Sequence, residues 1–141
     1  MFFGSYNHTL DEKGRLMIPR KMREQVGEVL YIMQGYDGSL SLYTETRYQA
    51  LVEEYSRLSF NQSKVRDYLR LQFASTFEIE IDKLGRIQLP TALLSKFNIS
   101  RDVMVLGIGD HIEIWDKTKY EDYENLKRNE FDAIAEEISN K

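Results

Sequence analysis

Polar and apolar residues alternate along several short stretches of the chain, with the two-residue period of a half-buried β-strand. In the first stretch, Tyr6, His8 and Leu10 alternate with more polar neighbours. The same pattern predicts short strands over residues 6–10, 15–18, 29–33, 39–43, 77–82, 86–89, 103–106 and 111–115. Because only a turn at 11–14 separates the first two strands, they are expected to form a β-hairpin with each other.

Other stretches have the period of an amphipathic helix. Thr44 is a suitable N-cap for a helix with apolar positions at Tyr48, Leu51, Val52, Tyr55 and Leu58. A second helix is predicted over 62–74, and the two should pack as the connection between the halves of the chain. A single last helix is predicted from Lys117 onward, with Tyr120, Tyr123, Phe131, Ile134 and Ile138 at helical spacing. Short helices are predicted after Pro19 and Pro90, because proline suits a first helical turn.

The segment LDEKGRLMIP at 10–19 occurs again as IDKLGRIQLP at 81–90. At an offset of 71 residues, the matched pairs are Asp11 with Asp82, Gly14 with Gly85, Arg15 with Arg86, and Pro19 with Pro90. The match continues at an offset of 72, between 41–48 and 113–120. The chain therefore contains two copies of one small unit.

A repeat of this size indicates two units that close a hydrophobic core together. We expect a mixed β and α fold: a small barrel or interdigitated sheet of about eight strands, related by a pseudo-two-fold axis, with helices outside. The predicted divisions are a first repeat at 5–47, a helical connection at 48–75, a second repeat at 76–119 and a C-terminal helix at 120–141.

Charge distinguishes the two copies. The net charge is −4, but residues 1–75 carry 10 basic and 9 acidic side chains, whereas residues 76–141 carry 9 and 14. Arg15 shares its strand face with Asn7 and Thr9, whereas Arg86 shares its face with Glu78 and Glu80. The first repeat is therefore the one expected to attract an anion.

The paired Asp and Arg of each turn have two interpretations. They can form an ion pair that fixes the turn, which both copies would need equally, or they can position a binding loop. An exposed ion pair contributes only about 0.2 to 1 kcal/mol to stability. Stability alone therefore gives little reason to repeat the pair, whereas positioning a binding loop would give one.

Five basic and no acidic residues lie between positions 13 and 23, a run that is either a solvated face or a DNA contact. If the run binds double-stranded DNA, Arg15 at the turn is the candidate for reading a guanine edge in the major groove. The predicted contacts to phosphates are Lys13, Arg20, Lys21 and Arg23. Because one chain offers few contacts, several linked copies on repeated sites are expected.

At these residues the chain resembles the MraZ family, whose members have two AbrB-like swapped-hairpin repeats. The resemblance rests on the start MFFGSYNHTLD, the two Asp-to-Arg motifs with their prolines, and the helices after each repeat. It implies a ring-shaped homo-oligomer associated with the nucleoid, and DNA binding through Arg15. It also implies transcriptional control of the division and cell-wall genes through short direct repeats in their promoter. The acidic residues of the second hairpin depart from a symmetric pattern and argue against a role for Arg86 in DNA binding.

Two other classes of function are less consistent with the sequence. An enzyme is disfavoured because His8 and His111 do not correspond in the repeats, and no catalytic triad, phosphate loop or metal-ligand spacing is present. Acidic residues that alternate on a strand, such as Glu78 and Glu80, are usually its solvent face. The alternative to a regulator is an AbrB-like interaction module, such as an antitoxin, whose main role is to bind a protein partner. In that case Tyr120, Tyr123 and Phe131 would serve helix packing or a subunit interface.

Composition adds cellular context. The chain has no cysteine, no apolar run near the roughly 18 residues of a membrane span, and no signal-peptide pattern at its start. A cytoplasmic protein without a cofactor, a metal or a membrane partner is therefore expected.

Overall fold

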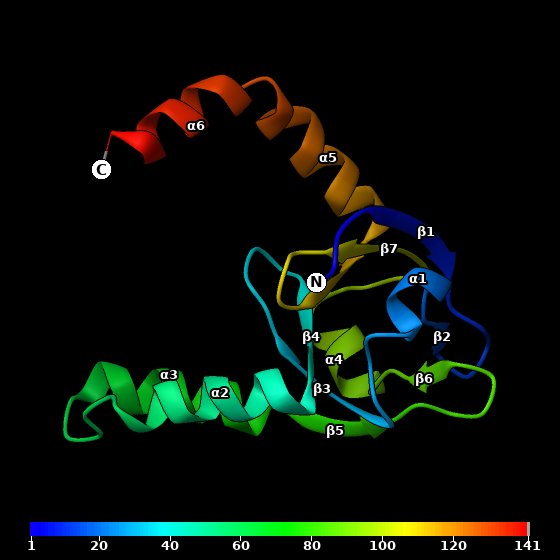
Figure 1. The fold of residues 1–141 in the computed structure, drawn as a ribbon, viewed down its shortest axis with the longest axis horizontal. Coiled ribbons are helices and arrows are strands. Elements are labelled where there is room, and N and C mark those ends of the chain that lie inside the picture. Colours follow the sequence, from blue (N-terminus) through cyan, green and yellow to red (C-terminus); the bar gives the residue numbers. More distant parts are fainter. Residues whose placement is uncertain (141) are drawn as a thin grey trace.

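The computed structural model describes residues 1–140 and combines eight strands with six helices (Figure 1). The strands are β1 (Ser5–Thr9), β2 (Arg15–Met17), β3 (Val29–Gln34), β4 (Leu40–Thr44), β5 (Phe77–Glu80), β6 (Arg86–Gln88), β7 (Asp102–Gly107) and β8 (Ile112–Asp116). The helices are α1 (Arg20–Arg23), α2 (Glu45–Ser56), α3 (Ser63–Ala74), α4 (Thr91–Lys96), α5 (Lys117–Arg128) and α6 (Phe131–Ser139). The eight predicted strands and the first four predicted helices are present, with ends shifted by a few residues.

The strands form two antiparallel sheets: a six-stranded sheet in the order β1-β7-β8-β4-β3-β5, and a two-stranded sheet of β2 and β6. The expected hairpin between the first two strands is wrong, because β1 pairs with β7 and β2 pairs with β6. The turn at 11–14 is tight, but beyond it the chain diverges toward partners in the other repeat. The alternation of polar and apolar residues identifies the buried face of a strand but does not say which other strand pairs with it. The pairing of β1 and β2 could therefore not be predicted from the local sequence.

The fold is thus mixed, with an antiparallel sheet and helices around it, and its ladders within residues 1–140 do not run as one closed ring. The core between the two sheets draws on both halves of the chain. Its fully buried members include Leu16, Ile18, Leu30, Ile32, Leu42, Ile87, Leu89, Val103, Ile112 and Ile114. Leu16 of β2 lies opposite Ile87 of β6, so the repeats meet at equivalent positions.

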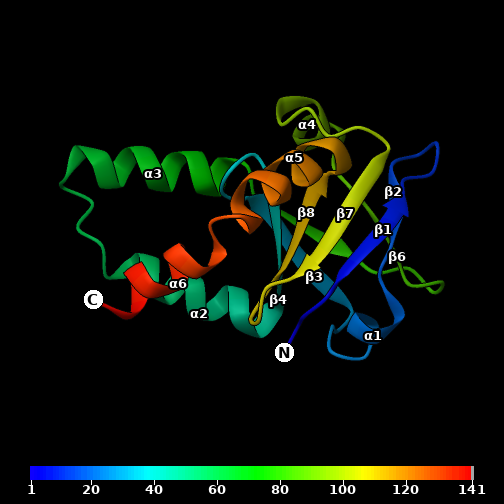
Figure 2. The same cartoon turned by 90° about the horizontal axis from the view of Figure 1, so that it is seen from above.

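Helices α2 and α3 extend away from the sheets to the same side and form one arm (Figures 1 and 2). The predicted cap is confirmed: the Thr44 hydroxyl accepts a hydrogen bond from the Arg47 amide at 3.3 Å. Within the arm, the hydroxyls of Tyr55 and Tyr68 lie 3.2 Å apart, and the Tyr55 ring meets Phe73 edge-on. Both helices contact the sheet at its β3 and β4 side, and aromatic side chains bridge the space between them.

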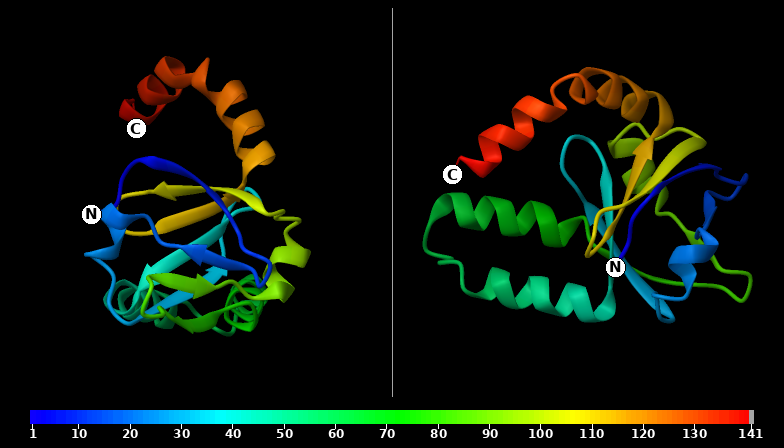
Figure 3. Two further views of the ribbon diagram at one scale, coloured as in Figure 1. Left: turned by 90° about the vertical axis from the view of Figure 1, so that its right-hand side faces the viewer. Right: turned by 45° about the horizontal axis from the view of Figure 1, so that its top comes forward.

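The last helix is interrupted, contrary to the prediction of one continuous helix. Helix α5 ends at Arg128 and α6 begins at Phe131, after a tight turn in which the Glu130 amide donates to the Lys127 carbonyl at 2.9 Å. The apolar spacing keeps its phase across this bend, so periodicity did not reveal it. Tyr120 and Tyr123 of α5 pack on Trp115, whereas α6 arches away from the sheets (Figure 3).

No helix within residues 1–140 is both long enough and apolar enough to cross a membrane.

Candidate functional site

The first turn is built around the Asp11 carboxylate. One carboxylate oxygen accepts hydrogen bonds from the backbone amides of Lys13 at 3.0 Å and Arg15 at 2.8 Å. The other accepts from Nε of Arg15 at 2.6 Å. Gly14 completes the turn with a φ of 75°, a conformation that glycine adopts without strain. These bonds, with the Arg15 amide as the largest cause, lower the pKa of Asp11.

The second turn repeats this geometry. Asp82 accepts from the amides of Leu84 and Arg86, both at 2.9 Å, and from Nε of Arg86 at 2.8 Å. Gly85 has a φ of 84°. The expected pairing of Asp with Arg across each turn is therefore confirmed in both copies. It also fixes each guanidinium through Nε, and within residues 1–140 the terminal nitrogens of Arg15 and Arg86 make no hydrogen bond.

Each turn is completed by the other repeat. The Gly14 carbonyl accepts from the Leu89 amide, and the Gly85 carbonyl accepts from the Ile18 amide, each at 3.0 Å. A side chain from the opposite short helix then covers each glycine: Leu94 of α4 lies over Gly14, and Arg23 of α1 lies over Gly85. The two covering positions are themselves 71 residues apart. Helix α1, which follows the first turn in sequence, therefore lies against the second turn.

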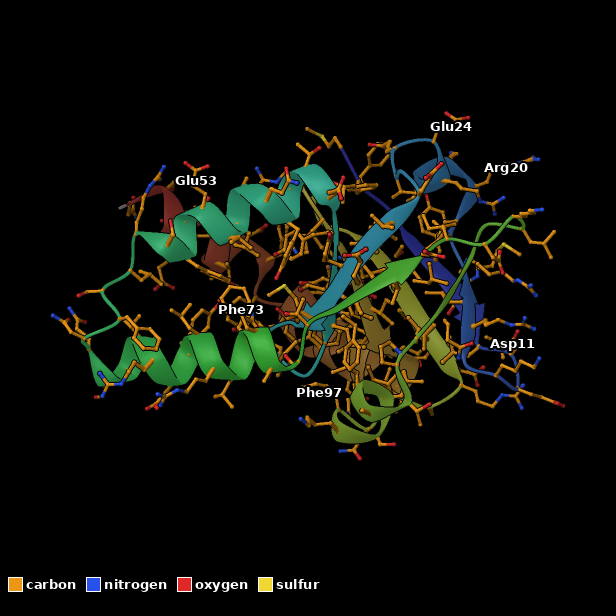
Figure 4. All side chains as sticks on the ribbon, turned by 90° about the horizontal axis from the view of Figure 1, so that it is seen from below. Asp11, Arg20, Glu24, Glu53, Phe73 and Phe97 are labelled. Carbon is orange, nitrogen blue, oxygen red and sulfur yellow. The ribbon has the colours of Figure 1, made fainter. Side chains whose placement is uncertain are left out.

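This arrangement brings both turns and α1 to the same end of the molecule. Figure 4 places Asp11 and Arg20 at that end, opposite the α2–α3 arm. Lys13, Arg20 and Lys21 have exposed side chains there. Pro19 and Pro90 precede α1 and α4 and position those helices.

Arg23 is placed differently from the other predicted contacts. Its Nη2 donates to the Ile18 carbonyl at 3.0 Å, and its Nε is buried without a hydrogen-bond partner among the described residues. A Cβ at Gly85 would lie only 2.6 Å from that Nε, so the guanidinium rests directly on the glycine. Arg23 therefore holds α1 against the second turn.

The two motif arginines are more alike in the structure than their sequence neighbours suggested. Their side chains are 29% and 25% exposed, and each has the turn aspartate as its ion-pair partner. Glu78, expected to crowd Arg86, accepts a hydrogen bond from the Tyr31 hydroxyl at 3.1 Å. Sequence reasoning also passed over Lys83, an exposed cation in the second turn. The position of Lys83 inside the repeated turn could have identified it as a candidate. The acidic composition of the second half of the chain argued against it.

Outside the two turns, titratable groups gather at the turn between β7 and β8. No cluster of His, Asp and Glu suited to a metal ion occurs within residues 1–140. His111 at the β7–β8 turn contacts Asp110 at 2.7 Å and Glu113 at 3.6 Å, and Arg47 pairs with Asp110 at 2.6 Å. His111 also stacks on the Tyr43 ring, so the group ties the end of β4 and the start of α2 to the turn.

Replacing His111 with glutamine should reduce stability more near pH 6 than near pH 8. Burial lowers the pKa of His111, but hydrogen bonds to Glu113 and Asp110 outweigh burial and hold this pKa above its ordinary value. The protonated form therefore stabilises the fold at low pH, and this contribution is lost as pH rises through the raised pKa. Urea unfolding at the two pH values checks this. A difference between wild type and variant that grows toward pH 8 would contradict it.

Comparisons with known proteins agree with the repeat. The family model described as "MraZ protein, putative antitoxin-like" matches twice, over residues 1–71 and 72–140. The chain is 41% identical over 139 residues to a transcriptional regulator MraZ from Mesoplasma florum, covering 98% of this chain and 95% of that protein. It is 36% identical over 138 residues to the protein of the same name from Mycoplasmoides gallisepticum, covering 98% and 97%.

Among solved structures, the solution structure of PHS018 from Pyrococcus horikoshii matches with a TM-score of 0.35 at 14% identity, over 81% of this chain and 88% of that one. A similarity this low supports no conclusion about fold. The family model and the full-length relatives do decide the relationship, and they show that the chain belongs to the MraZ family.

Proposed function

We propose that this protein is a sequence-specific transcriptional regulator that binds double-stranded DNA with the end of the molecule formed by its two turns. The observation that carries the proposal is that each motif arginine is fixed through Nε while its terminal nitrogens remain without a partner among the described residues. An arginine held in this way can donate two parallel hydrogen bonds to O6 and N7 of guanine. The relatives named as transcriptional regulators support this function.

The other basic residues would act on the DNA backbone. Lys13, Arg20 and Lys21 are exposed at the same end and can neutralise phosphates, which fixes register and makes affinity depend on salt. Arg23 contributes by holding α1 in place. Lys83 is a further candidate for a phosphate contact because it lies in the second turn.

The pairing of β2 with β6 and of β1 with β7 supports an AbrB-like swapped-hairpin barrel, with the repeats at 5–47 and 76–119 as its two halves. In this proposal residues 48–75 form the helical connection and residues 120–141 the C-terminal extension. Neither a cofactor nor a catalytic residue is required.

We further infer that the protein acts as a ring-shaped homo-oligomer in the cytoplasm, associated with the nucleoid. Its proposed targets are short direct repeats in the promoter of the division and cell-wall gene cluster. A single chain offers two arginine turns and a few lysines, so linked copies on adjacent repeats would raise the affinity through effective concentration.

Replacing Arg15 with alanine should weaken binding to the specific DNA by about 1 to 3 kcal/mol for each contacted site. The Arg86→Ala variant should lose less, because strand β5, which leads into its turn, carries Glu78 and Glu80, whereas strand β1, which leads into the turn of Arg15, carries no acidic residue. Sites selected from random DNA, followed by titration at several salt concentrations, provide the measurement. Replacing Arg57 at the tip of the α2–α3 arm with alanine is the matched control and should not change affinity per site.

Circular dichroism must show that all three variants remain folded. Equal losses in Arg15→Ala and Arg86→Ala would refute the assignment of the first turn as the main reading element. An interaction with DNA that is absent, or insensitive to salt, would refute DNA binding and favour the partner-binding alternative.

A further inference from the structure

The two turns have the same internal geometry, but the opposite repeat holds the chain before each turn in a different way. The Leu10 amide, directly before the first turn, donates to the Arg101 carbonyl at 2.8 Å. At the matched place before the second turn, the Ile81 amide donates to the Glu28 carbonyl at 2.9 Å. Arg101 and Glu28 lie directly before β7 and β3, so they occupy equivalent positions in the fold.

The side chains at these two positions have opposite chemistry. Nε and Nη2 of Arg101 both donate to the Leu10 carbonyl, each at 3.3 Å. Hydrogen bonds from a guanidinium are charge-assisted and stronger than those between neutral groups. The carboxylate of Glu28 has no proton to donate, so it cannot hold the Ile81 carbonyl in the same way. Arg101 therefore gives the first turn a support that Glu28 cannot give to the second.

Arg101 is itself held in place by its neighbours in the chain. The amide and the hydroxyl of Ser100 donate to the buried Asp116 carboxylate at 2.8 and 2.7 Å. On the other side, Asp102 pairs with Thr9 in the β1–β7 ladder and accepts a hydrogen bond from the Thr9 hydroxyl at 3.1 Å. The backbone on both sides of Arg101 is therefore fixed, and its guanidinium extends from a rigid base.

The Leu10 carbonyl is well placed to control the first turn. It belongs to the planar peptide group that also contains the Asp11 amide, and this amide donates to the Arg15 carbonyl at 3.1 Å. The Asp11 carboxylate accepts hydrogen bonds from the Lys13 and Arg15 amides and from Nε of Arg15. A rotation of the peptide group would shift Asp11 and, with it, the guanidinium of Arg15.

We propose that Arg101 is a positioning residue for the first turn. Its guanidinium fixes the peptide group between Leu10 and Asp11, and through Asp11 it fixes the direction in which Arg15 presents its terminal nitrogens. This inference rests on the proposed function, because that direction matters only if Arg15 reads DNA. It supplies a reason, separate from local charge, for the first turn to be the main reading element.

The first test needs no DNA. Amide hydrogen exchange, followed by mass spectrometry on the full-length protein, compares peptides that cover residues 13–15 with peptides that cover residues 84–86. Arg101→Ala should speed exchange in the first turn about 5-fold, as expected for the loss of one hydrogen bond, and leave the second turn unchanged. Arg101→Lys, which keeps the charge and a donor, should recover part of the protection. Equal acceleration in both turns, or none in either, would overturn the proposal.

Glu28→Ala is the matched control, because it changes the equivalent exposed position without removing a donor from the Ile81 carbonyl. Exchange in the second turn should then stay at the wild-type rate. Faster exchange there would show that any substitution at these positions loosens the nearby turn, and the specific role of the Arg101 guanidinium would be overturned.

Titration with DNA separates positioning from direct contact, which is the other role open to the exposed Arg101 side chain. In Arg101→Ala, affinity for the selected site should fall about 5-fold while the dependence of affinity on salt stays the same, because no phosphate contact is lost. A salt slope reduced by about 1 would assign Arg101 to a phosphate and overturn the positioning role. A wild-type protein that binds no DNA would refute the proposed function, whereas the exchange rates would still decide whether Arg101 fixes the turn.

Discussion

Replacing Gly107 with alanine is expected to destabilise the protein by about 2 to 4 kcal/mol, through overpacking against a rigid part of the backbone. Gly107 ends β7 beside the N-terminal segment. A Cβ at this position would lie 2.5 Å from the carbonyl carbon of Phe2 and 2.6 Å from Cα of Phe3. Real Cβ atoms do not approach other atoms so closely, and backbone atoms cannot rotate away as a side chain can.

The segment at 2–4 would therefore have to move. Its displacement would break the hydrogen bond from the Gly107 amide to the Gly4 carbonyl at 2.9 Å, and the two bonds between Phe2 and Gly109 at 2.8 and 2.7 Å. It would also withdraw the buried Phe2 ring from the core. Each of these losses adds to the cost of the clash itself.

Gly35 provides a matched control, since it occupies the corresponding position of the first repeat, 72 residues earlier. A Cβ there would lie 2.7 and 2.8 Å from the hydroxyls of Ser39 and Ser41, which can rotate, although the Ser39 hydroxyl would give up its hydrogen bond to the Tyr36 carbonyl. The nearest backbone atom, the Ser39 carbonyl oxygen, would be 3.1 Å away, farther than the backbone atoms near Gly107. Gly35→Ala should cost less than half as much as Gly107→Ala. Urea unfolding of both variants at one protein concentration measures the loss in free energy of unfolding. A larger loss for Gly35→Ala would contradict the prediction and show that the segment at 2–4 can move at little cost.

The repeat alignment predicted the local structure of the turns because that structure depends on a few adjacent residues. An aspartate four positions before an arginine, with glycine between them, was enough to anticipate the ion pairs of Asp11 with Arg15 and Asp82 with Arg86. The cap at Thr44 was predictable for the same reason. Each of these features is decided within about five residues of the chain.

Features that depend on contacts between the repeats were not predictable in this way. Alternation gave the buried face of each strand, but the pairing of β2 with β6 is decided by packing across the pseudo-two-fold axis. The position of Arg23 on Gly85 follows from this pairing, and the sequence alone grouped Arg23 with the wrong turn. The bend at Asn129 was missed because the apolar period continues through it.

Truncating Leu16 or Ile87 to alanine should cost about 2 to 5 kcal/mol each, the range for deleting a large aliphatic side chain from a core. Both side chains are fully buried and lie opposite each other in the β2–β6 ladder, where the repeats meet. Because the two positions are neighbours, the double variant should cost less than the sum of the single variants. Met17→Ala, on an exposed position of β2, should change stability by no more than about 0.5 kcal/mol.

These core variants also test how the turns are supported. The Gly14 and Gly85 carbonyls accept hydrogen bonds from Leu89 and Ile18, which directly follow β6 and β2. Loosening this two-stranded sheet should therefore weaken DNA binding without any change of charge, at temperatures where the protein remains folded. Unfolding curves at one protomer concentration, paired with DNA titrations, make the comparison, because self-association would add a dependence on concentration. DNA affinity that stays at the wild-type level in a folded Leu16→Ala variant would mean that each turn keeps its geometry through its own aspartate alone.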